Sequence, residues 1–177
     1  AGGPGASDGL RGPVPGGGAR VALLPGSRRS EVTSNLPLLL DAARRVCEER
    51  PDVRFVVPLA VERLRDAVEG ALVGSGLDVA VAPPENSDDA MQASDAALAV
   101  SGTATLHLVH HGVPAVIVYH ASPTGLALAK VLLVSPFIAL PNLLSGREAQ
   151  REFLTSSDDG SELAAALLDI LPGAPGR

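Results

Sequence analysis

The sequence has few aromatic residues, a single cysteine and no tryptophan. Only Phe55, Tyr119, Phe137 and Phe153 are aromatic among its 177 residues, and they are scattered. Single-stranded nucleic acids bind to closely spaced aromatic side chains, so this class of protein is excluded. The net charge of −6 also argues against a nucleic-acid binder with a broad basic field. The lone Cys47 cannot form an internal disulfide, which is compatible with a reducing cytoplasm.

Long apolar runs are also absent. The most apolar window, residues 125–140, contains Lys130 and is interrupted at Pro136, whereas a membrane-spanning helix needs roughly 20 apolar residues. A helix packed on the core is the preferred interpretation of this window. Contact with a membrane or a partner is the alternative.

Glycine and proline are concentrated at the start of the chain. Residues 1–19 contain eight Gly and three Pro, and such a stretch buries too little apolar surface to offset the entropy of ordering it. It lacks the basic start and apolar centre of a signal peptide. We therefore predict a flexible linker over 1–19, one domain over 20–171 and a flexible tail over 172–177.

From residue 20 onward, short runs of Val, Ala, Leu and Ile alternate with helical patterns. The runs show no polar alternation, which is typical of strands buried on both faces. The predicted strands are 20–24, 53–58, 77–82, 95–100 and 114–119, and the predicted helices are 31–50, 61–73, 87–93, 103–111, 124–134, 147–154 and 161–171, with a turn at 141–142. This alternation predicts an α/β fold, a Rossmann-like doubly wound parallel sheet of about five strands.

Two loops after predicted strands carry candidate ligand-binding residues, because ligands bind outside the carboxyl ends of parallel strands. In the first loop, Gly26 permits a sharp turn, Ser27 or Ser30 can cap the next helix, and Arg28 can reach an anion. The loop has neither a Walker A pattern nor a dinucleotide fingerprint. An ordinary capped turn with solvated arginines is the alternative interpretation.

The second loop, Ser101-Gly102-Thr103, follows the fourth predicted strand and opens a helix. Hydroxyls and unpaired amides at such a position can hold a phosphate, and glycine leaves room for it. Simple capping of the helix is the alternative. Together with the basic first loop, this one favours a diphosphate ligand.

All four histidines, His107, His110, His111 and His120, lie within fourteen residues. His107 and His111 have the i,i+4 spacing of a metal site. No cysteine or acidic residue in the same helix completes such a site, so none is predicted. At least one of these histidines is expected to line the ligand crevice.

A polar stretch follows the apolar window and contains Asn142, Arg147, Glu148 and Glu152. Such side chains in an otherwise aliphatic region suggest recognition of a ligand. A cap residue and a surface ion pair are the alternative interpretation.

At these residues the sequence resembles the C-terminal half of lipid-A-disaccharide synthase, a glycosyltransferase family with the two-domain GT-B architecture. Six runs carry the resemblance, in the family's order: LLPGSRRSEV (23–32), FVVPLA (55–60), SDAALAVSGTATL (94–106), GVPAVIVY (112–119), LAK (128–130) and LPNLLSGR (140–147).

The resemblance implies an inverting sugar transfer. UDP-2,3-diacylglucosamine donates its sugar to 2,3-diacylglucosamine 1-phosphate (lipid X), without a metal or organic cofactor. It implies that this half binds the sugar donor, while an N-terminal GT-B domain supplies much of the acceptor site and the catalytic base. It places the protein in the cytoplasm, peripheral to the inner membrane of a Gram-negative-type bacterium, and allows for a homodimer.

The resemblance also suggests roles for residues. It implies catalytic roles for Arg28, which would face the sugar donor's diphosphate, and for Asn142, which matches a family residue needed for activity. Contacts with the UDP-sugar fall on Gly26, Ser27, Arg28, Ser101, Gly102, Thr103, His107, His120, Arg147 and Glu152.

Three positions depart from the family pattern. His107 replaces a Glu that binds ribose hydroxyls in related enzymes, His120 replaces an Arg, and Thr155 replaces a Gln. The departures leave two alternatives: a non-catalytic nucleotide-sugar-binding module, or another GT-B enzyme of the UDP-N-acetylglucosamine epimerase type. The LPNLL run argues against the latter.

Overall fold

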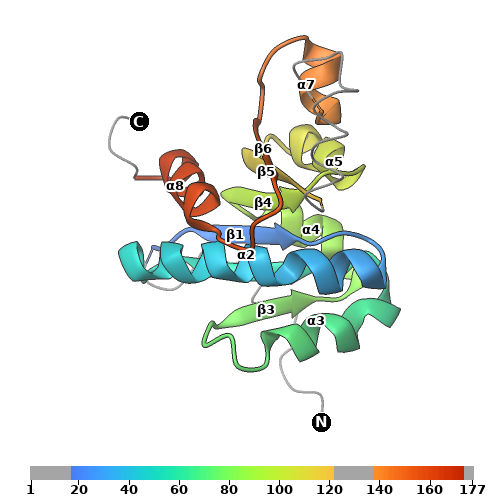
Figure 1. The fold of residues 1–177 in the computed structure, drawn as a ribbon, viewed down its shortest axis with the longest axis vertical. Coiled ribbons are helices and arrows are strands. Elements are labelled where there is room, and N and C mark those ends of the chain that lie inside the picture. The colour runs from blue at the N-terminus through green and yellow to red at the C-terminus, as the bar shows by residue number, and fades with distance from the viewer. Residues whose placement is uncertain (1–16, 122–137, 174–177) are drawn as a thin grey trace.

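The computed structural model describes residues 17–121 and 138–173, which form a parallel β-sheet with helices on both faces (Figure 1). The strands follow the order β3-β2-β1-β4-β5-β6 and every neighbouring pair is parallel. This is the doubly wound Rossmann order, in which the direction of winding reverses between the first and fourth strands. The predicted fold class is therefore confirmed. The strands are β1 (Arg20–Leu24), β2 (Arg54–Pro58), β3 (Val79–Ala82), β4 (Ala96–Val100), β5 (Ala115–His120) and β6 (Arg151–Thr155).

The helices divide between the two faces of the sheet. On one face, α2 (Arg29–Glu49), α3 (Arg65–Leu72) and α8 (Ser161–Ile170) bury their aliphatic side chains against the strands. On the other, α4 (Ser87–Gln92), α5 (Ala104–His110) and the segment at Ala139 enclose a smaller cluster. The short helix α7 (Leu140–Ser145) contacts α5, and the 3-10 turns η1 (Glu62–Leu64) and η2 (Pro84–Asn86) precede α3 and α4.

Two predictions near the C-terminus were wrong. The segment predicted as a helix over 147–154 contains the sixth strand, which pairs with β5 from Val116↔Arg151 to His120↔Thr155. The predicted turn at 141–142 lies inside α7, because Pro141 occupies the first turn of the helix, where no N–H is needed. Gly146, with a φ of 66°, caps that helix.

Some predicted segments lie outside the described residues. These are the helix over 124–134, most of the linker over 1–19 and the end of the tail over 172–177. Among the helices of residues 17–121 and 138–173, none has the length and apolar content needed to span a membrane.

Candidate functional site

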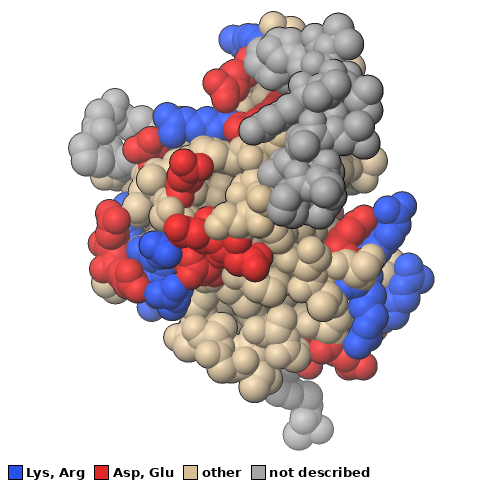
Figure 2. Space-filling view, viewed as in Figure 1, with Lys and Arg blue, Asp and Glu red and all other residues tan. Residues whose placement is uncertain are grey.

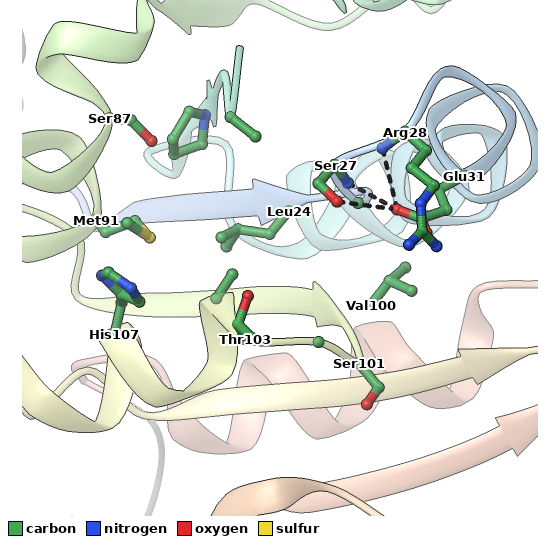
Figure 3. Close-up of a pocket in the computed structure, with 15 residues that line it drawn as sticks. Leu24, Ser27, Arg28, Glu31, Ser87, Met91, Val100, Ser101, Thr103 and His107 are labelled. Carbon is green, nitrogen blue, oxygen red and sulfur yellow. Dashed lines mark hydrogen bonds and ion pairs between the residues drawn. The ribbon is translucent and has the colours of Figure 1, made fainter.

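A cleft of about 540 Å³ lies at the carboxyl ends of β1 and β4, where the direction of winding reverses. Both loops that the sequence singled out line it. Arg28 and Thr103 face it from opposite sides (Figure 3). A ligand is expected at this point of an open parallel sheet. The predicted residues brought together here are Gly26, Ser27, Arg28, Ser101, Gly102, Thr103 and His107.

The loop after β1 is closed by a carboxylate. Glu31 Oε2 accepts hydrogen bonds from the backbone N–H groups of Ser27 (2.7 Å) and Arg28 (3.1 Å). Its Oε1 accepts one from Arg28 Nη1 at 3.0 Å. Burial by itself would raise the pKa of Glu31, but these N–H groups and the guanidinium outweigh it and lower that pKa. Arg28 nevertheless remains 78% exposed, so most of its guanidinium can still meet an anion.

The loop after β4 presents small residues to the cleft. A Cβ added to Gly102 would meet no atom within 4 Å, so the space above this backbone is open. Thr103 turns its hydroxyl toward the cleft, whereas Ser101 points the other way, toward β5 (Figure 3). Since α5 has only seven residues, this loop offers backbone amides and a hydroxyl rather than the field of a long helix.

His107 lines the end of the cleft near α4, and a carboxylate from that helix lies beside it. Asp88 Oδ1 is 3.4 Å from His107 Nδ1 and 2.9 Å from His111 Nε2. These contacts, first with His111 and then with His107, lower the pKa of Asp88. They join α4 to α5 at the cleft wall. In residues 17–121 and 138–173, no group of three metal-ligating side chains could hold an ion.

The other predicted site residues, His120, Asn142, Arg147 and Glu152, are not among those that line the cleft. Asn142 is fully buried. Its Oδ1 accepts the N–H groups of Ala149 and Gln150, both at 2.8 Å, and its Nδ2 donates to Gln150 O and Glu152 Oε1. The second oxygen of Glu152 accepts the N–H of Ile138 at 2.8 Å. This arrangement joins α7 to β6 and leaves the Asn142 amide engaged inside the fold.

The two remaining residues lie at the surface or near it. Arg147 is exposed in the turn after α7. His120, at the end of β5, has its Nε2 3.6 Å from Asp158 Oδ1, while its buried Nδ1 has no hydrogen-bond partner among residues 17–121 and 138–173. Contacts of these residues with a ligand stay predictions.

Comparison with known proteins decides the family. A family model described as lipid-A-disaccharide synthetase matches residues 14–174. The chain belongs to this family. The resemblance seen in the sequence is thereby confirmed.

Curated lipid-A-disaccharide synthases are similar over most of this chain. The protein of Pseudomonas putida is 40% identical over 154 residues, covering 87% of this chain and 41% of its own. That of Geobacter sulfurreducens is 35% identical over 147 residues, covering 83% and 38%. That of Alkalilimnicola ehrlichii is 40% identical over 161 residues, covering 90% and 42%. The chain thus spans about two fifths of the length of the synthases it matches.

A solved structure supports the fold. A crystal structure from Listeria monocytogenes, named for UDP-N-acetylglucosamine 2-epimerase, matches with a TM-score of 0.56 at 16% identity. The match covers 93% of this chain and 38% of the other. At this identity the likeness concerns the fold alone.

Two acidic residues at the cleft of this synthetase-family chain, Glu31 and Asp88, were not predicted from the sequence. The structure caps α2 with Arg28 rather than with Ser27 or Ser30, so the Ser/Thr-x-x-Glu pattern of a capping box is not in the sequence at this point. An acidic residue in the first turn of a predicted helix that follows a candidate ligand-binding loop is the signal that could have drawn attention to Glu31. Asp88 could not have been found in this way. Its partners are 19 and 23 residues away in the chain and meet it only through the packing of α4 on α5.

Proposed function

We propose that this chain is the sugar-donor-binding half of a lipid-A-disaccharide synthase. The whole enzyme would transfer the sugar of UDP-2,3-diacylglucosamine to lipid X, giving the lipid A disaccharide and UDP. The observation that carries the proposal is the cleft between β1 and β4. It has a basic loop on one side and the Ser101-Gly102-Thr103 loop on the other, in a chain of this family.

The chemistry of the transfer fits these groups. When the sugar leaves, negative charge grows on the UDP phosphate, and a positioned cation stabilises that charge. Arg28 supplies the cation, and Gly102 and Thr103 supply amides and a hydroxyl on the opposite wall. Basic side chains gather where α2 begins, at the right-hand edge of the face shown in Figure 2, despite the net charge of −6.

Both substrates of the proposed reaction carry acyl chains, so we place the enzyme at the cytoplasmic face of the inner membrane. Exposed apolar side chains on α5 and α7 support a peripheral contact: Val109, Leu143 and Leu144 are 45%, 44% and 77% exposed. An N-terminal GT-B domain would complete the acceptor site. A homodimer remains a prediction from the family resemblance.

Calorimetry with UDP tests the proposal. The chain is expected to bind UDP, and Arg28→Ala is expected to weaken binding about tenfold to a hundredfold, the worth of a charge-assisted hydrogen bond. Arg29→Ala is the matched control, since Arg29 is the next arginine but does not line the cleft. No heat of binding at millimolar UDP would count against the proposed function. Equal effects of the two substitutions would remove Arg28 from the site.

The alternative, a non-catalytic nucleotide-sugar-binding module, is motivated by His107 and His120 in place of the family's Glu and Arg. It also predicts binding of UDP. The two differ in turnover once an N-terminal domain is supplied, because only the enzyme half would then form the disaccharide.

A further inference from the structure

We infer that Glu31 is a positioning residue of the cleft, which acts through Arg28. Its carboxylate holds the 26–28 loop closed and orients the Arg28 guanidinium toward the anionic part of the ligand. The inference rests on the proposed function, since it concerns how the same cleft receives a diphosphate.

The contacts of Glu31 converge on this one loop. Its two oxygens accept from the N–H groups of Ser27 and Arg28 and from Arg28 Nη1, at 2.7, 3.1 and 3.0 Å. The Ser27 hydroxyl is a further 3.5 Å contact. Figure 3 shows these interactions as dashed lines at the rim of the cleft. Glu31 therefore takes up two N–H groups of the loop that leads into α2, so these two are not offered to an anion.

Gly26 provides an independent observation for the same closure. Its φ is 122°, a conformation that residues with a side chain rarely adopt. A Cβ added here would lie 2.6 Å from both the Cβ and the Oε2 of Glu31. The glycine is thus required for the Glu31 side chain to close over the loop. Its contribution to the site is made through Glu31 rather than through direct approach of a ligand.

This closure determines what the loop can offer a ligand. The amides of Ser27 and Arg28 are already bonded to Glu31, so the guanidinium is the charged group through which this loop can meet an anion. A guanidinium has five N–H donors, and the bond from Nη1 to Glu31 leaves the others available. In the part of the chain that the structure describes, no other residue pairs with the Arg28 side chain.

The charge of Glu31 acts against this role, because a carboxylate near a bound diphosphate repels it. The repulsion is weak between groups in contact with water. Ordering a long exposed arginine when a ligand binds loses conformational entropy. Because Glu31 already holds the Arg28 side chain in the free protein, less entropy is lost on binding. We therefore expect loss of Glu31 to weaken binding, about five- to thirtyfold.

A double-mutant cycle on the full chain tests the inference, with UDP as the probe and calorimetry as the measurement. Glu31→Ala is expected to weaken UDP binding about tenfold when Arg28 is present, and less than twofold in the Arg28→Ala background. Equal losses in both backgrounds would reduce Glu31 to a merely structural residue. Tighter binding by Glu31→Ala would make it a competitor of the ligand, and either result overturns the inference.

Two further variants keep the test valid if Glu31→Ala fails to fold. Gly26→Ala is expected to give the same loss, with no additional loss when it is combined with Glu31→Gln. Glu31→Gln keeps an acceptor for the loop amides but cannot form the exposed ion pair, so it is expected to bind UDP more weakly while its unfolding temperature falls only slightly. If the unmodified chain does not bind UDP, the proposed function fails. If it binds UDP but the cycle is additive, only this inference fails.

Discussion

A single buried amide, that of Asn142, joins three segments at the C-terminal part of the sheet. The residue was predicted to be catalytic, yet its oxygen accepts the N–H groups of Ala149 and Gln150, and its nitrogen bonds with Gln150 and Glu152. Buried polar groups are costly when they lose a partner. A requirement for this residue can therefore arise from holding α7 against β6 rather than from contact with a substrate.

Asn142→Ala is expected to lower the free energy of unfolding by about 2–4 kcal/mol, because two backbone N–H groups lose their acceptor. UDP affinity of the remaining folded protein is expected to stay unchanged, since Asn142 does not line the cleft. Denaturant unfolding and calorimetry on the same preparation measure both. A variant of normal stability that no longer binds UDP would contradict this and place Asn142 at the ligand.

The sequence located the cleft residues better than it assigned their contacts. Gly26, Arg28, Gly102 and Thr103 were found because they follow strands, and the ends of parallel strands meet at one edge. The internal role of Asn142 could not be found in this way. It depends on Glu152, ten residues away, and on a strand that the sequence did not predict.

At the scale of elements, the buried strands were the most predictable part of the fold. The predicted 20–24 coincides with β1, and the other four predicted strands differ from the observed bounds by at most two residues. Apolar runs without alternation identify such strands directly. Both edge strands are partly exposed, but β3 has the sequence Val-Ala-Val-Ala, whereas β6 has Arg-Glu-Phe-Leu-Thr. Arg, Glu and Leu favour helices, and only pairing with β5 overrides that preference.

The contact between α2 and α8 depends on Gly160. A Cβ at this position would lie 2.4 Å from the backbone nitrogen of Ala42 and 2.7 Å from its Cα. Gly160→Ala is therefore expected to cost about 1–3 kcal/mol by overpacking. Gly70→Ala is the control, because a Cβ there meets nothing within 4 Å and alanine favours the helix α3, adding about 0.5–1 kcal/mol. Thermal unfolding compares the two, and a tolerated Gly160→Ala would mean that α8 can move away from α2.

The same helix pair carries a pH-dependent contact at Asp41. The pKa of Asp41 is lowered to about 2, first by a hydrogen bond from Arg45 at 2.8 Å and then by one from the Gly160 N–H at 2.9 Å. Burial by itself would raise this pKa. Because the pKa is lower in the folded chain than in the unfolded one, this stabilisation is complete above about pH 4. It is lost as the pH falls toward 2.

Asp41→Asn is expected to destabilise the chain by about 1–2 kcal/mol at neutral pH and to have little effect near pH 2. Denaturant unfolding between pH 2 and 7 measures the difference in unfolding free energy between Asp41→Asn and the unmodified chain. A difference that does not change with pH would show that the charge of Asp41 has no part in the contact.

On the scale of the whole molecule, the chain is one Rossmann unit, and the Pseudomonas putida and Geobacter sulfurreducens synthases it matches are more than twice as long. Its cleft holds groups suited to a departing diphosphate. The titratable acceptors that line it in the described residues are both engaged: Glu31 with Ser27 and Arg28, and His107 with Asp88. Sugar transfer also needs a base that takes the proton of the acceptor hydroxyl. That base is expected from the N-terminal domain.

The last prediction separates binding from turnover. This chain by itself is expected to bind UDP but to form no disaccharide, because the acceptor hydroxyl must be held within about 3–3.5 Å of the reacting carbon, on the face opposite UDP. Joined to the N-terminal half of the Pseudomonas putida synthase, it is expected to bind UDP equally well and to gain transfer from UDP-2,3-diacylglucosamine to lipid X. The intact relative is the positive control, and the joined protein with Arg28→Ala is the negative one.

Turnover by the chain alone would place the base in this half. A correctly folded joined protein that binds UDP but transfers nothing would favour the non-catalytic module, and would identify His107 and His120 as the first positions to restore to Glu and Arg.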